Sequence, residues 1–130
     1  TVIRYAIRSC KEWEEAFSKE DRYISVKSLG ENIRINLSEV YFAEVYDRKI
    51  IIHMINENVE YYGQLSDLET LVGEGFYRIF RSYLVNLRFV ERYDGSQVTL
   101  SDKTKLPIAR RSYSGFIKAY MDYNWKKGTN

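Results

Sequence analysis

In residues 76–86, FYRIFRSYLVN, apolar and aromatic side chains alternate with arginines and then run into a continuous apolar stretch. This pattern predicts one β-strand whose first half has a single buried face and whose second half is buried on both faces. Arg78, Arg81 and Asn86 are then held on stiff backbone, and arginine and asparagine make bidentate contacts with phosphates and base edges. From composition alone, the commoner interpretation is that the two arginines only face solvent.

The residues around this segment predict a mostly β fold. Strands are predicted at residues 23–27, 33–37, 40–46, 50–55 and 59–62, with clean alternation of apolar and polar residues in 33–37, and turn-forming residues separate these runs. Residues 87–93 and 97–100 predict a hairpin across Asp94-Gly95. Residues 103–108 predict an edge strand, since Pro107 cannot donate a hydrogen bond to a neighbouring strand.

Three segments have helical spacing. Residues 2–17 carry one apolar stripe, which suits packing against a core or a partner equally well, and residues 18–21 form the boundary after it. Ser66 and Glu69 have capping-box spacing at the start of a short acidic helix that ends at Gly73 or Gly75. Residues 113–121 present an aromatic face typical of core packing, and residues 124–130 are predicted to be a tail.

Length and composition limit the class of protein. A chain of 130 residues with 45% hydrophobic residues suits one folded domain, residues 22–123, preceded by a linker helix in residues 1–21. The single Cys10 excludes an internal disulfide and a four-cysteine metal site, which fits a cytoplasmic protein. No apolar run is long enough to span a bilayer, and the first residue, Thr1, suggests a fragment of a longer protein.

The sequence contains no pattern typical of an enzyme or a cofactor site. No nucleophile has a neighbouring base, and no phosphate-binding glycine loop or zinc motif is present. His53 lies between Ile52 and Met54 without ligands at metal-binding spacing, so we expect it to be structural. We therefore expect a binding module with no catalytic residue, metal or cofactor.

Charge is distributed unevenly along the chain. Residues 1–43 have no net charge, residues 44–75 carry −5, and residues 76–130 carry +7. Such an asymmetry can orient a domain toward a polyanion even though the whole chain is only +2. The alternative is that the opposite charges meet in the folded protein.

Two motifs, residues 76–86 and the string LPIARR at residues 106–111, closely resemble the LytTR family of bacterial DNA-binding domains, which form the output end of many two-component response regulators. The resemblance extends from Tyr23 to about Tyr120 and includes residues 62–69, similar to the family's strand-to-helix junction. Phe80 stands where the family often has histidine, and Lys103 where a turn glycine is common. The resemblance implies an elongated stack of antiparallel sheets.

The resemblance also implies a function and a site. The expected function is sequence-specific binding of promoter double-stranded DNA, in the cytoplasm of a bacterium, as the transcriptional output of a phosphorelay. An upstream receiver domain and a homodimer on DNA are the expected partners, and no membrane is involved. Arg111 is the best candidate for base readout, and Arg110 is expected to reach phosphate or to pair with an acid. The full set of candidate DNA-binding residues is Arg48, Lys49, Arg78, Arg81, Asn86, Arg110 and Arg111.

Two other functions remain open. The apolar stripe that includes Trp13 and the tyrosine-rich sheet also suit a protein-interaction module. Twelve tyrosines, if exposed, also suit an RNA-binding β module in which rings stack on bases.

Overall fold

The structure is a computed structural model that describes residues 22–128, so the predicted linker helix in residues 1–21 lies outside it. It confirms the mostly β class, with antiparallel sheets, a short internal helix and a C-terminal helix. The strands are β1 (Tyr23–Ser28), β2 (Glu31–Asn36), β3 (Val40–Tyr46), β4 (Lys49–Met54), β5 (Asn58–Tyr62), β6 (Phe76–Phe80), β7 (Tyr83–Asn86), β8 (Val90–Tyr93), β9 (Gln97–Leu100) and β10 (Lys105–Pro107). The helices are α2 (Leu65–Val72) and α3 (Tyr113–Gly128).

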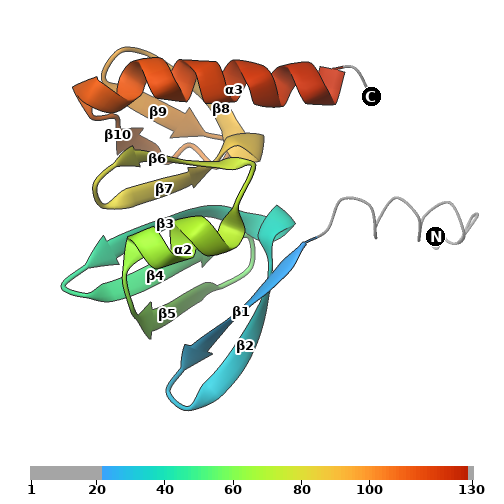
Figure 1. Cartoon of the computed structure of the whole chain (residues 1–130), viewed down its shortest axis with the longest axis vertical. Coiled ribbons are helices and arrows are strands. Elements are labelled where there is room, and N and C mark those ends of the chain that lie inside the picture. The colour runs from blue at the N-terminus through green and yellow to red at the C-terminus, as the bar shows by residue number, and fades with distance from the viewer. Residues whose placement is uncertain (1–21, 129–130) are drawn as a thin grey trace, which may run out of the picture.

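Three antiparallel sheets follow one another along the long axis of the molecule (Figure 1). The first is the β1–β2 hairpin, the central sheet has the strand order β5-β4-β3-β7-β6, and the third has the order β10-β9-β8. Helix α2 lies against the central sheet, and α3 crosses the end of the stack (Figure 1). In the part of the chain that is described, no helix is long and apolar enough to cross a membrane.

The central sheet separates two hydrophobic cores. Ala43 and Leu84 face the first core, between the sheet, α2 and the β1–β2 hairpin. Phe42 and Val85 face the second, which the third sheet and α3 complete. Because neighbouring residues of β3 and of β7 enter opposite cores, these strands are buried on both faces, as the apolar run in residues 83–85 predicts.

The predicted single strand over residues 76–86 is wrong: the segment is a hairpin of β6 and β7 that turns at Arg81-Ser82. A hairpin buries Ile79 on one strand and Leu84 and Val85 on the other, all fully shielded from solvent. The polar pair between these apolar residues provides the turn. The sequence pattern did not indicate this turn because aromatic residues, which are typical of strands, lie on both sides of it at Phe80 and Tyr83.

Helix α2 does not form the predicted capping box. Its N-cap residue is Gln64, without a side-chain capping bond, because the helix begins at the buried Leu65. Ser66 lies in the first turn instead, where its carbonyl accepts a hydrogen bond from the Thr70 hydroxyl. The C-terminal end is at Gly73 as predicted, with φ 67°.

Helix α3 begins at Tyr113 as the aromatic spacing predicts and continues to Gly128, through most of the predicted tail. Phe116 is fully buried, with its ring centroid 5.3 Å from that of Tyr93 and 5.7 Å from that of Tyr120. The Tyr120 hydroxyl donates to the Val90 carbonyl over 3.0 Å. The aromatic face of the helix therefore belongs to the second core.

Candidate nucleic-acid interface

Three arginine-bearing turns lie along one edge of the molecule, the left edge in Figure 1. Arg48 is in the β3–β4 turn, Arg81 is in the β6–β7 turn, and Arg110 and Arg111 are in η3 (Arg110–Ser112), the 3₁₀ turn that precedes α3. We call these four residues the arginine edge. Tertiary structure brings the three turns to one edge, since they are up to 63 residues apart in the numbering.

Backbone hydrogen bonds link the three turns. The Val45 amide, near the end of β3, donates to the Ser82 carbonyl over 3.1 Å. The Ala109 amide, which immediately precedes η3, donates to the Ile79 carbonyl over 2.8 Å. The turns are therefore attached to one framework of strands, and rigid elements hold side chains at a more constant spacing than free loops do.

The arginine edge is available to an anionic partner. All four side chains are exposed, and within the described residues none of them makes an ion pair. Lys49, adjacent to Arg48, lies 3.4 Å from Glu60, with 41% of its side chain exposed. An ion pair this exposed is weak, so Lys49 can exchange its carboxylate for a phosphate at little cost.

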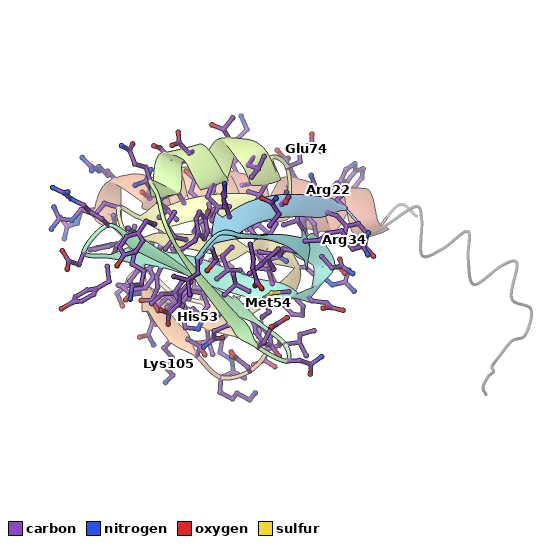
Figure 2. All side chains as sticks on the ribbon, turned by 90° about the horizontal axis from the view of Figure 1, so that it is seen from below. Arg22, Arg34, His53, Met54, Glu74 and Lys105 are labelled. Carbon is purple, nitrogen blue, oxygen red and sulfur yellow. The ribbon has the colours of Figure 1, made fainter. Side chains whose placement is uncertain are left out.

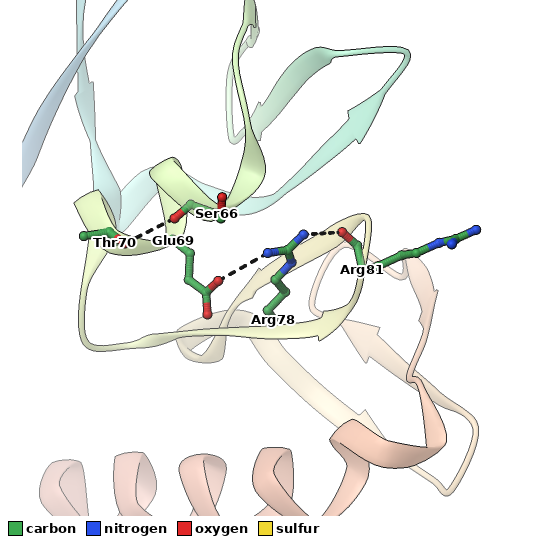
Figure 3. A network of polar contacts seen from close by, with 5 residues as sticks. All are labelled: Ser66, Glu69, Thr70, Arg78 and Arg81. Atoms are coloured by element: carbon green, nitrogen blue, oxygen red, sulfur yellow. Dashed lines mark hydrogen bonds and ion pairs between the residues drawn. The ribbon is translucent and has the colours of Figure 1, made fainter.

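Arg78 differs from the arginines of the edge. Its side chain is 31% exposed and lies between α2 and the β6–β7 turn (Figure 3). One guanidinium nitrogen is 3.5 Å from a Glu69 carboxylate oxygen, and the other donates to the Arg81 carbonyl over 2.6 Å. The Arg81 side chain points away from this contact (Figure 3).

Asn86 is 4% exposed, which corrects the expectation that it contacts DNA. Its amide nitrogen donates to the carbonyls of Leu37 and Val40, over 3.1 and 2.8 Å. Its side-chain oxygen accepts from the Arg88 amide over 3.0 Å, which caps the 3₁₀ turn η2 (Leu87–Phe89). Both polar atoms of the Asn86 side chain therefore form hydrogen bonds with the protein backbone.

A sequence signal for this structural role exists in the string Asn-Leu-x-x-Val, which occurs at residues 36–40 and again at residues 86–90. In both copies the asparagine side chain caps a 3₁₀ turn between two strands. The repetition would have assigned Asn86 to the fold rather than to the site.

Two exposed tyrosines were missed by the sequence-based site prediction. Tyr46 and Tyr62 are 77% and 73% exposed, and each is the cross-strand partner of Lys49. The Lys49 ammonium lies 5.9 Å from the centre of the Tyr62 ring. Directly opposed residues share a sheet face, so the two rings flank Lys49 beside the Arg48 turn. In the sequence, each of these tyrosines is the last residue of a predicted strand, and this position was the feature that could have identified them.

The rest of the described surface does not suggest a metal or catalytic site. His53 stacks on Phe42, with ring centroids 4.3 Å apart, and its Nε2 is 2.5 Å from a Glu44 carboxylate oxygen. No group of three or more potential metal ligands occurs among the residues described. Arg22 and Arg34 lie on the side of the molecule opposite the arginine edge (Figure 2).

A β domain that presents unpaired arginines from several turns along one edge has the form of a nucleic-acid-binding module. A family model described as the LytTr DNA-binding domain matches residues 30–121. The chain therefore belongs to the LytTR family of DNA-binding domains, as the two sequence motifs indicate.

One solved structure with the same fold is the LytTr DNA-binding domain of a protein from Bacillus cereus that is provisionally described as a methyl-accepting/DNA response regulator. The TM-score is 0.64 at 19% sequence identity, and the similarity covers 75% of this chain and 94% of the other. Among curated proteins, no match was found.

Proposed function

We propose that this domain binds promoter double-stranded DNA in a sequence-specific manner and acts as the output domain of a bacterial transcriptional response regulator. The observation that carries the proposal is the arginine edge, whose guanidinium groups are exposed and without ion pairs in the described structure. Family membership and the description of the Bacillus cereus protein support it. We also propose that the domain acts in the cytoplasm and follows a receiver domain in the full-length protein. Phosphorylation of that receiver through a phosphorelay would control dimerisation on DNA.

The β3–β4 hairpin and η3 would enter neighbouring grooves on one face of the duplex, and the β6–β7 turn lies between them along the edge (Figure 1). The major groove is about 12 Å wide and admits a two-stranded ribbon such as β3–β4. Arg111 is assigned to base readout, since arginine binds guanine through two hydrogen bonds. Arg110 and Lys49 are assigned to phosphates.

Tyr46 and Tyr62 extend this proposed contact. Tyrosine hydroxyls bond phosphate oxygens, and both rings are exposed next to the Arg48 turn. Because exposed rings also stack on unpaired bases, binding of single-stranded RNA is the second candidate function. A competition between duplex DNA and single-stranded RNA separates the two, and preference for the RNA would overturn the assignment to promoter DNA.

The direct test is selection of bound duplexes from a random library, followed by affinity measurements on the recovered sequence and on random duplex. Arg111→Ala should weaken specific binding by roughly 10- to 100-fold, the effect of losing one bidentate base contact, and random binding only slightly. Lys49→Ala should weaken both by the same small factor. Equal losses on the two duplexes for Arg111→Ala would refute its role in base readout.

A further inference from the structure

Strand β6, which leads into the Arg81 turn of the arginine edge, contains a β-bulge. The pairing of β6 with β7 shifts register between Arg78, opposite Leu84, and Phe80, opposite Tyr83. The ladder is therefore irregular at Ile79, two residues before Arg81. Bulges commonly redirect side chains next to functional sites.

Two contacts from the bulged segment hold the arginine-bearing turns. The Ile79 carbonyl accepts from the Ala109 amide and so fixes the start of η3. The Arg78 guanidinium donates to the Arg81 carbonyl and so holds the backbone of the β6–β7 turn where the regular ladder does not. The same strand thus supports two turns of the edge, one through its backbone and one through a side chain.

The Arg78 side chain is oriented from the other side by α2. The Glu69 carboxylate lies 3.5 Å from the guanidinium nitrogen that does not bind the turn (Figure 3). The Arg78 Nε is buried and has no hydrogen-bond partner within the described structure, which is an energetic cost of this placement.

We propose that Arg78 is a positioning residue for Arg81: it fixes the carbonyl of the Arg81 turn so that the Arg81 side chain meets the duplex in one orientation. This inference rests on the proposed function. Arg78 itself would then make no DNA contact, in contrast to the sequence-based expectation. Its effect on DNA binding would pass entirely through Arg81.

A double-mutant cycle on the specific and random duplexes tests the proposal. Arg78→Met removes the donors and keeps an unbranched apolar stem, and we expect it to lower the ratio of specific to random affinity by roughly tenfold. In an Arg81→Ala background the same substitution should change neither affinity, because the residue that it positions is gone. Arg78→Lys, which retains one cationic donor, should restore part of the ratio. Thermal unfolding of each variant separates these effects from a general loss of stability.

The outcomes distinguish the two proposals. If Arg81→Ala alone leaves DNA binding unchanged, the role of Arg81 in the proposed function fails. If Arg81→Ala weakens binding and Arg78→Met causes the same further loss in that background, Arg78 acts independently and the positioning role is overturned.

If Arg78→Met does not fold, Glu69→Gln tests the proposal instead. Its matched control is Asp67→Asn, which removes the same charge from the exposed face of α2 without contacting Arg78. The proposal expects only Glu69→Gln to lower the ratio of specific to random affinity, by roughly two- to threefold, as for a weak, half-exposed ion pair. Equal ratios for the two variants would overturn it.

Discussion

At the scale of single residues, Arg48 shows a conflict between the fold and the proposed function. Asp47 and Arg48 form the two-residue β3–β4 turn with φ values of 52° and 69°. Turns of this type favour glycine at the second position, because a side chain with positive φ crowds its own backbone. An arginine at such a position is unfavourable for the hairpin, which agrees with a role in binding rather than in folding.

Replacing Arg48 by glycine should therefore separate stability from binding. We expect Arg48→Gly to raise the free energy of unfolding by about 0.5 to 1 kcal/mol, because the strain of the left-handed conformation exceeds the entropy cost of glycine. The same variant should weaken binding to duplex DNA. Chemical denaturation and a titration with DNA measure the two effects.

Arg48→Ala is the matched control, since it removes the charge and keeps the positive φ. It should weaken DNA binding to the same extent without the gain in stability. A loss of stability in Arg48→Gly would contradict the assignment of strain to this turn.

Tyr61 makes stability depend on pH in the alkaline range. Burial, and secondarily the charge of Asp67, raise the pKa of its hydroxyl from 10.0 to about 12. Because the folded pKa lies above the unfolded one, the stabilising effect of the neutral hydroxyl is fully present below pH 10 and is lost as the pH rises toward 12. Tyr61→Phe should reduce the fall in unfolding free energy across this range, measured by denaturation at several pH values.

The exposed neighbour Tyr62 offers the control for this measurement. Tyr62→Phe removes a hydroxyl at the same end of β5 but from a ring that is mostly in solvent, so it should leave the alkaline decline unchanged. The same decline in the wild type and in Tyr61→Phe would show that other groups cause it.

For the candidate site, the sequence indicated residue types but not the orientations of their side chains. Arginine and lysine in turns between strands pointed to an anionic partner, and the turn residues Arg48, Arg110 and Arg111 are exposed. Arg78 and Arg81 looked equivalent in the sequence because both interrupt an apolar pattern. They differ because Arg81 lies in the β6–β7 turn. There its carbonyl accepts a hydrogen bond from Arg78, while its side chain points away from this contact.

At the scale of elements, the period-two pattern predicted most strands because one face of each is buried. It failed where a polar turn is flanked on both sides by aromatic residues, at Arg81-Ser82. It also assigned residues 87–89 to a strand, although Asn86 caps them as the 3₁₀ turn η2. The second failure has a local cause, since the Asn86 side chain accepts from the Arg88 amide two residues later, and a period-two pattern does not record such caps.

The contact between α3 and β6 depends on Gly115. A Cβ atom at this position would lie 2.1 Å from the Tyr77 hydroxyl oxygen and 3.2 Å from the ring carbon that bears it. We expect Gly115→Ala to lower the free energy of unfolding by about 1 kcal/mol, since overpacking costs roughly 1–3 kcal/mol and the helix preference of alanine offsets about 1. DNA affinity should fall as well, because α3 directly follows η3. Thermal unfolding and a DNA titration measure both effects.

A second substitution identifies the cause. Tyr77→Phe removes the atom nearest to the new methyl group, so the double variant Tyr77→Phe/Gly115→Ala should recover most of the lost stability. Purely additive effects of the two substitutions would argue against a steric clash at this contact.

At the scale of the whole molecule, the uneven charge distribution has two interpretations: attraction of a polyanion, or pairing of opposite charges within the fold. The structure agrees in part with each of them. Glu69 of the acidic segment does pair with Arg78 of the basic one, whereas Glu60 pairs with Lys49 of its own segment. The arginine edge remains without ion pairs among the described residues. Its alignment could not be predicted from composition, because it depends on the backbone bonds between residues 45 and 82 and between residues 79 and 109.

Salt dependence tests whether binding uses this edge or only the net charge. If about six phosphates are neutralised, the logarithm of the affinity should fall with the logarithm of the salt concentration at a slope of roughly −5. The double variant Lys49→Ala/Arg110→Ala, which removes the two cations assigned to phosphates along this edge, should reduce the slope to roughly −3, since each lost phosphate contact removes about 0.9. The control Lys27→Ala/Arg34→Ala removes the same charge from the β1–β2 hairpin, a separate sheet, and should leave the slope unchanged. Equal reductions in the two double variants would mean that the duplex responds to the total charge of the domain, and the arginine edge would then have no special role in binding.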